Sequence, residues 1–242
     1  MIRAFILIAF ALIATGAPAQ IAQMLPPIAP DDRANWIAVG QLSRKGQNNK
    51  GICTGTLISP DKVITAAHCV ASRAGYPYAP QSITFFAGRN GDEAAAKRRV
   101  AKIYVHPGYI VTEGVAKAAY DVAVLALERP IPARRVQPYP LRSGPISGGL
   151  LTVLGYQNRN PGILNGRSDC RILEMQPAYM GLSCNVISGN SGGPVLRRIG
   201  PDWYLVGVVT SKVGYAGGPG PALAARIGNW AMEQRDRATN SD

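Results

Sequence analysis

The chain has 242 residues, of which 47% are hydrophobic and 17% are charged. This length and balance fit one large domain or two small ones with buried cores, and they exclude a low-complexity or repeat protein. The 26 basic and 14 acidic residues give a formal net charge of +12, but the basic clusters are scattered and accompany no nucleic-acid-binding motif. We therefore expect no nucleic-acid partner.

The first 19 residues have the pattern of an export signal. Arg3 gives the positive end, residues 4–14 form an uninterrupted apolar run, and Ala17 and Ala19 are the small residues expected before a cleavage site. A membrane-spanning helix needs about 20 apolar residues, which this run does not reach. We therefore expect a secreted or periplasmic protein without stable membrane insertion after signal removal.

Residues 20–34 are rich in proline and alanine, and we expect a flexible lead or a short propeptide there. The run Asp31-Asp32-Arg33 could be a processing site or a solvated turn, and the sequence does not decide between them. One folded domain is expected from residue 35 to residue 240.

From Trp36 onward, short segments rich in β-forming residues alternate with turn signals, which is typical of a β-barrel or sandwich. The expected strands of the first half are residues 36–42, 51–58, 63–67, 82–87, 100–105 and 122–127. The high proline content of residues 129–147 predicts a linker between two halves. The second half has strand patterns at 150–156, 171–179 and 202–211, and helical composition at 222–235.

Residues 188–194, Ser-Gly-Asn-Ser-Gly-Gly-Pro, place a serine among glycines. Glycine lets the backbone adopt conformations that a side chain would forbid, and it lets a substrate carbonyl approach closely. A sharp turn here would expose Ser191 Oγ and point the N–H groups of Gly189 and Ser191 in one direction. Two such donors form an oxyanion hole, which stabilises charge that develops in a transition state.

A serine needs a base to become a good nucleophile, and both histidines, His68 and His106, precede Ser191. The glycine spacing around Ser191 also fits the G-x-S-x-G turn of α/β-hydrolases, but those enzymes carry the histidine after the serine. His68 ends an expected strand, in Thr-Ala-Ala-His-Cys, and is the preferred base. His106 stands in a His-Pro-Gly-Tyr turn, where proline fixes the bend, and it is the alternative base.

Asp121 stands directly before the apolar strand 122–127. A carboxylate in that place would be partly buried and would need a partner. The partner that we expect is the second ring nitrogen of His68, because Asp121 could then hold the tautomer and stabilise the imidazolium. The alternative is an aspartate that only initiates the strand.

The segments around His68, Asp121 and Ser191, in that order along the chain, resemble those of the trypsin/chymotrypsin-like serine peptidases, particularly the compact bacterial branch that includes glutamyl endopeptidases. The resemblance implies an all-β fold of two six-stranded antiparallel β-barrels, at about 35–128 and 148–240, with a C-terminal α-helix that packs on the second barrel. It implies catalytic roles for these three residues and an oxyanion hole at Gly189 and Ser191. We expect a protein or peptide substrate, a monomer, and no metal or organic cofactor.

An exported chain can form disulfides, and four cysteines allow three pairings. Zinc binding is the alternative, but no C-x-x-C pair is present. The family resemblance implies Cys53–Cys69, which would tie the histidine loop to the preceding strand. It also implies Cys170–Cys184, which would brace the approach to the serine loop.

The sequence departs from the family pattern around the serine. Many animal members have an aspartate just before the nucleophile, which pairs with a newly cut N-terminal amine, whereas this chain has Asn190. We therefore expect any activation to work without that ion pair. Asn185, implied at the floor of the substrate pocket, is neutral and does not support an Arg or Lys preference. Thr210 and Lys212 are implied on the pocket wall, where Lys212 could favour an acidic residue or point to water.

The sequence thus predicts an exported serine endopeptidase that hydrolyses peptide bonds through an acyl-enzyme. One alternative is a catalytically silent, basic surface-binding protein on the same fold, which would explain the charge. Another is an esterase that uses the same serine.

Overall fold

The structure is a computed structural model that describes residues 24–45, 52–146, 148–214 and 218–238. The expected signal peptide, residues 1–19, lies outside the described residues. Within the described ranges, no helix is long and apolar enough to cross a membrane.

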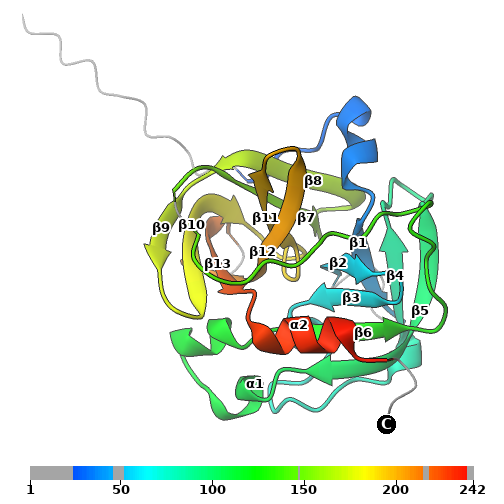
Figure 1. The fold of residues 1–242 in the computed structure, drawn as a ribbon, viewed down its shortest axis with the longest axis horizontal. Coiled ribbons are helices and arrows are strands. Elements are labelled where there is room, and N and C mark those ends of the chain that lie inside the picture. The colour runs from blue at the N-terminus through cyan, green and yellow to red at the C-terminus, as the bar shows by residue number, and fades with distance from the viewer. Residues whose placement is uncertain (1–23, 46–51, 147, 215–217, 239–242) are drawn as a thin grey trace, which may run out of the picture.

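Six antiparallel strands close into a barrel in the first half of the chain (Figure 1). They are β1 (Val39–Arg44), β2 (Cys53–Ser59), β3 (Lys62–Thr65), β4 (Ile83–Ala87), β5 (Ala96–Val105) and β6 (Ala123–Leu127). Their order around the barrel is β1-β2-β3-β6-β5-β4. On β4, Ile83, Phe85 and Ala87 are buried while the residues between them are not, because successive strand side chains face opposite ways.

The second half forms a seven-stranded antiparallel sheet in place of the expected closed barrel of six strands. Its strands are β7 (Leu151–Gln157), β8 (Asn160–Cys170), β9 (Ile172–Met175), β10 (Tyr179–Val186), β11 (Pro194–Ile199), β12 (Asp202–Lys212) and β13 (Gly220–Arg226). Their order is β8-β7-β11-β12-β13-β10-β9. The extra strand is β9, which follows β8 directly and pairs with β10 at one end of the sheet.

The helices are short, and the expected C-terminal one is present. They are α1 (Gly108–Val111), α2 (Asn229–Asp236) and the 3-10 helices η1 (Pro30–Trp36), η2 (Ala67–Cys69), η3 (Pro80–Ser82) and η4 (Val115–Ala119). α2 lies alongside β6 and contacts it, so it packs on the first barrel and not on the second as the resemblance implied (Figure 1).

The helical composition of residues 222–235 is a wrong guide for the start of that segment, because residues 222–226 belong to β13. Ala222, Ala224 and Ala225 are fully buried there, and β13 pairs with both β10 and β12. Strand pairing on two sides and burial therefore override the helix preference of alanine.

The described part of the N-terminal segment is held on the second sheet, which differs from the expectation of a flexible lead. Leu25 is 2% exposed, and its carbonyl accepts a hydrogen bond from the side chain of Gln157 at 3.0 Å. Pro26 O accepts the N–H of Gly166 at 2.8 Å, and the Ile28 N–H donates to Leu164 O at 2.9 Å. The segment therefore buries apolar surface and pairs its backbone, which fixes it in place.

One apolar cluster spans the two halves of the molecule. Val39 and Leu57 of the first barrel belong to the same buried cluster as Leu154 and Val208 of the second sheet. Residues 129–146 cross between the halves with paired backbone groups, since the Tyr139 N–H donates to Leu57 O and Pro140 O accepts from the Leu205 N–H. The two halves therefore meet along an apolar surface, and the candidate site lies where they meet.

Candidate active site

Two neighbouring strands bring His68 and Asp121 to the same end of the first barrel. His68 lies on η2, directly after β3, and Asp121 lies just before β6. β3 and β6 run antiparallel with Thr65 opposite Ala123. Because the end of one antiparallel strand meets the start of its neighbour, residues 53 positions apart in the chain become adjacent.

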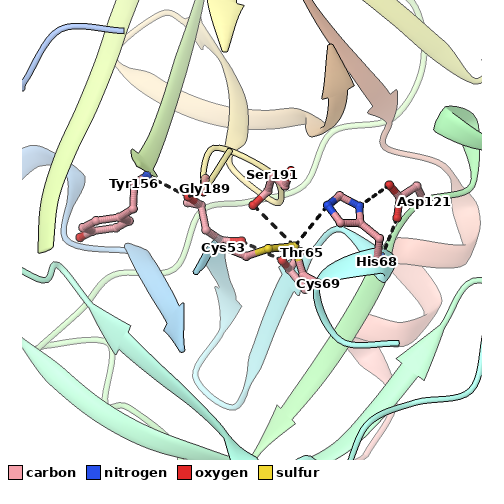
Figure 2. Close-up of a disulfide and its surroundings, with 9 residues drawn as sticks. Cys53, Thr65, His68, Cys69, Asp121, Tyr156, Gly189 and Ser191 are labelled. Carbon is pink, nitrogen blue, oxygen red and sulfur yellow. Dashed lines mark hydrogen bonds and ion pairs between the residues drawn. A yellow bond between two sulfur atoms is a disulfide. The ribbon is translucent and has the colours of Figure 1, made fainter. Parts of the chain in front are cut away.

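The carboxylate of Asp121 accepts two hydrogen bonds from His68. Oδ2 lies 2.6 Å from ring nitrogen Nδ1, and Oδ1 accepts the backbone N–H at 2.8 Å. An ionised carboxylate only accepts, so Nδ1 donates and Nε2 is left able to take a proton. Figure 2 shows the imidazole with Asp121 on one side and Ser191 on the other. Burial, and then the Asp121 charge, raise the pKa of nearby Tyr109 to about 12.

The serine loop, residues 187–193, is a tight turn that depends on glycine. Gly189 has a φ of 103°, and a Cβ there would lie 2.8 Å from the carbonyl oxygen of Tyr156. Gly192 has a φ of 82°, and a Cβ there would lie 2.0 Å from the carbonyl oxygen of Thr54. Both positions combine a left-handed backbone with close approach to another chain segment, so a side chain cannot be accommodated.

Asn190, which is fully buried, holds the loop with its side-chain amide. Its Oδ1 accepts the Ile187 N–H at 2.9 Å, and its Nδ2 donates to Tyr156 O at 2.9 Å. The amide thus satisfies one backbone donor and one backbone acceptor at the same time. An aspartate could make the first bond but has no proton for the second when it is ionised.

Three described N–H groups of the loop, those of Ser188, Gly189 and Ser191, lack intramolecular acceptors, and Ser188 is exposed to solvent. Among the described residues, neither the Gly189 N–H nor the Ser191 N–H has a hydrogen-bond partner, whereas the Asn190, Gly192 and Gly193 N–H groups all donate within the protein. Buried backbone donors are almost always paired. Gly189 itself is buried, so an oxygen of a bound molecule would complete its hydrogen bonding.

Thr54 on β2 ties the serine loop to the first barrel. Its Oγ1 donates to Gly189 O at 2.8 Å and accepts the Tyr156 N–H at 2.9 Å, and its N–H donates to Ser191 O at 2.8 Å. Sequence analysis missed this residue, because its partners lie more than 100 positions away. A hydroxyl that is fully buried in a strand indicates a hydrogen-bonding role, but the burial of Thr54 is known only from the structure.

Two open pockets meet at Ser191. One has a volume of about 260 Å³ and is lined by both His68 and Ser191, together with Arg44, Ile52, Cys53, Cys69, Tyr78, Asn158, Ser188 and Gly189. The other has a volume of about 340 Å³ and is lined by Ser191 with Val186, Ile187, Ser188, Val209, Ser211, Lys212 and Gly214. The serine hydroxyl and the imidazole thus share one cavity, and a second cavity continues on the other side of the serine.

Of the three residues expected around the substrate pocket, only Lys212 lines the second cavity. Thr210 is 2% exposed, and its hydroxyl donates to Leu223 O at 3.2 Å. Asn185 pairs with Pro221 and Met24 in the sheet. Strand alternation explains the two misses, because Asn185 precedes the lining residue Val186 on β10 and Thr210 lies between the lining residues Val209 and Ser211 on β12.

The structure joins Cys53 to Cys69 and Cys170 to Cys184, the two pairs that the resemblance implies. The first disulfide links β2 to η2 beside His68, and the second links β8 to β10. Cys53, His68 and Cys69 lie close together, but both sulfur atoms are in the disulfide and neither is a thiolate that could bind zinc.

His106, the alternative base, lies apart from the serine. Its Nδ1 accepts the Gly108 N–H at 3.0 Å, and its ring lies 4.7 Å from Trp230 and 5.1 Å from Tyr120. Burial lowers the pKa of His106 below its usual value. It lines neither pocket at Ser191, so its surroundings are those of a structural histidine.

Comparison with known proteins agrees with this architecture. The sequence model of the trypsin family matches residues 28–231. The chain is 28% identical to a trypsin of Saccharopolyspora erythraea over 75% of this chain and 86% of that protein. It is 28% identical to the cercarial protease of Schistosoma mansoni over 67% of this chain and 71% of that protein, and 27% identical to serine protease SP24D of Anopheles gambiae over 80% and 78%.

Among solved structures, a Glu endopeptidase in complex with MPD superposes with a TM-score of 0.70 at 22% identity, covering 88% of this chain and 95% of that one. At this identity the likeness concerns the fold, and it confirms the chymotrypsin-like architecture. The family match extends over most of the chain and includes both halves of the molecule. The chain therefore belongs to the trypsin-like family of serine endopeptidases.

Proposed function

We propose that this chain is an exported endopeptidase that hydrolyses peptide bonds with the triad His68, Asp121 and Ser191. The observation that carries the proposal is the 2.6 Å contact between His68 Nδ1 and Asp121 Oδ2, with Ser191 in the cavity that His68 lines. Two disulfides fit an oxidising compartment outside the cytoplasm, which agrees with the signal-like first 19 residues.

In the proposed reaction, Ser191 Oγ bonds to the substrate carbonyl carbon while His68 Nε2 takes the hydroxyl proton. The carbonyl oxygen becomes an oxyanion, which the N–H groups of Gly189 and Ser191 would stabilise, since neither has another partner among the described residues. The C–N bond then breaks as His68 gives its proton to the leaving amine. Water repeats the same steps on the acyl-enzyme and releases the carboxylic acid.

Asn190 supports a loop that needs no new N-terminal amine. In the aspartate version of this turn, an ion pair with such an amine orders the oxyanion hole. Here the neutral amide bonds the Ile187 N–H and the Tyr156 carbonyl directly. A propeptide, if one is removed, would then act by covering the site and not by withholding an ion-pair partner.

The second pocket would take the side chain on the acyl side of the scissile bond. Its described lining has three apolar residues, Val186, Ile187 and Val209, and its one charged residue is Lys212. No carboxylate is among these lining residues, so the pocket lacks the partner that an arginine or lysine side chain would need. We expect the enzyme to disfavour cleavage after basic residues.

The experiment is digestion of an unfolded protein by the purified, signal-free enzyme, with the cleavage sites identified by mass spectrometry. Ser191→Ala and His68→Ala serve as matched inactive variants. Cleavage that both variants lose, and that rarely follows Arg or Lys, is the expected result. Cleavage that survives in either variant would contradict the triad, and no cleavage by the wild type would favour a silent binding protein.

A further inference from the structure

Arg44 lies over the ring of Tyr78 at the edge of the pocket that contains His68 and Ser191. The guanidinium carbon lies over the ring, 3.8 Å from its centroid, which is within the range of a cation–π contact. Both residues line the 260 Å³ pocket, and both are partly exposed. The proposed hydrolysis uses neither side chain.

The backbone holds this pair firmly beside the site. Arg44 is the last residue of β1, where it pairs with Ile83 of β4, and the next N–H, of Lys45, donates to Ser82 O at 2.8 Å. The Tyr78 N–H donates to Val70 O at 2.9 Å, so Tyr78 is tied to the segment that follows η2 and His68. A fixed aromatic ring orients the guanidinium, and less entropy is lost when it binds a ligand.

The chemistry of the proposed reaction identifies this pocket as the leaving-group side. His68 has to protonate the leaving amine, so the residues that follow the scissile bond must pass along the cavity that His68 lines. His68 does not line the opposite cavity, which contains Lys212. A substrate that occupied both cavities would therefore have its acyl part beside Lys212 and its amine part beside Arg44.

The charge in the leaving-group pocket has one sign. Among its described lining residues are the Arg44 cation and no carboxylate, and the nearby Asp121 is 7% exposed and bound to His68. A guanidinium carries five N–H donors in a planar fork, and two of them can match the two oxygens of a carboxylate. An acidic side chain in this pocket would gain a charge-assisted hydrogen bond, and a basic one would be repelled.

We propose that Arg44 and Tyr78 form a carboxylate-binding subsite for an aspartate or glutamate in the first two residues after the scissile bond. The proposal rests on the protease function proposed above and adds a substrate class to it. The preferred substrates are then peptides with an acidic residue on the leaving-group side. One charge-assisted hydrogen bond at a partly exposed site corresponds to a preference of about tenfold.

The test measures how the acyl-enzyme divides between water and an added amine. The enzyme is acylated with an activated ester, and the dipeptide amides Glu-Leu, Gln-Leu, Leu-Glu and Leu-Gln are supplied as acceptors. Because the product ratio compares two fates of one acyl-enzyme, it does not depend on how fast that species forms. In at least one of the two pairs, Glu-Leu against Gln-Leu or Leu-Glu against Leu-Gln, the wild-type acyl group should be transferred about tenfold more to the glutamate-containing amide than to the glutamine-containing one.

Three variants make the result specific. Arg44→Met keeps a long side chain on Tyr78 without charge and should lose the glutamate preference, whereas Arg44→Lys should keep part of it. Arg198→Met removes another arginine that lies over an aromatic ring, Trp203, but does not line this pocket, and it should behave as wild type. Equal transfer to glutamate and glutamine amides by wild type, or a preference that persists in Arg44→Met, would overturn the proposal. Failure of the ester to acylate the wild type would overturn the protease function as well.

Discussion

At the scale of single residues, the buried carboxylate of Asp121 decides which nitrogen of His68 can act as a base. Asp121→Asn keeps the shape and presents a donor to Nδ1, so the proton moves to Nε2 and the imidazole can no longer accept from Ser191. We expect kcat to fall by about 10⁴-fold, with little change in the thermal midpoint. Steady-state kinetics and a melting curve check this, and a loss below tenfold would remove Asp121 from the mechanism.

Asn190 allows a second residue-scale prediction. Asn190→Asp would place a carboxylate in a fully buried site, opposite the Tyr156 carbonyl oxygen that now accepts from Nδ2. Leaving a buried acceptor unsatisfied costs roughly 1–3 kcal/mol, and a buried charge costs more. We expect a lower free energy of unfolding in urea and slower peptide hydrolysis. An Asn190→Asp enzyme that became active only after its N-terminus was cut would contradict the account.

At the scale of elements, the His106 turn is locked between Tyr120 and α2 through Trp230. Burial lowers the pKa of His106 in the folded protein below its ordinary value of about 6.5. At pH values between these two pKa values, the histidine is more protonated in the unfolded chain than in the folded one, and protonation therefore favours unfolding. Stability should therefore be complete above about pH 6.5 and should fall below it. Arg226 is the other charged side chain that lines the same cavity.

His106→Asn tests this, because its Oδ1 can replace Nδ1 as acceptor for the Gly108 N–H but does not titrate. The drop in thermal midpoint between pH 7 and pH 5.5 should be smaller in the variant than in wild type. Identical drops in the two proteins would show that another group carries the pH dependence.

The start of β3 contains a buried ion pair that the sequence presents as a turn. Lys62 is 1% exposed, and its Nζ lies 2.6 Å from Asp61 Oδ2, whose side chain is 31% exposed. Asp61→Ala should lower the free energy of unfolding by about 2 kcal/mol. This is less than the roughly 3–5 kcal/mol lost when one partner of a fully buried ion pair is removed, because Asp61 is partly solvated. The double variant Asp61→Ala/Lys62→Met should recover most of that loss in a urea titration. A double variant as unstable as the single one would mean that Lys62 is held mainly by other partners.

These elements also explain what the sequence can and cannot predict. The apolar strands, the helix α2 and the proximity of His68 to Asp121 follow from local patterns and from antiparallel pairing. The composition of residues 222–226 wrongly predicts helix, because an alanine-rich sequence carries no information about strand pairing on both sides. The expected export signal stays a prediction, since it lies outside the described residues.

At the scale of the whole molecule, the site exists only where the two halves meet. His68 and Asp121 come from the first barrel, the serine loop comes from the second sheet, and Thr54 bonds across the junction to Gly189 and Ser191. No local pattern could predict the pair of Arg44 and Tyr78 or the role of Thr54, because each depends on contacts across folded segments. The proposed function therefore depends on docking of the halves as well as on the three proposed triad residues.

The most direct test of whether His68 activates Ser191 is labelling of the signal-free protein with a fluorophosphonate, followed by mass spectrometry of the modified peptide. We predict one phosphonylated residue, Ser191, and no labelling of Ser191→Ala or His68→Ala. Labelling elsewhere, or labelling of Ser191 that persists in His68→Ala at the wild-type rate, would contradict a serine activated by that histidine.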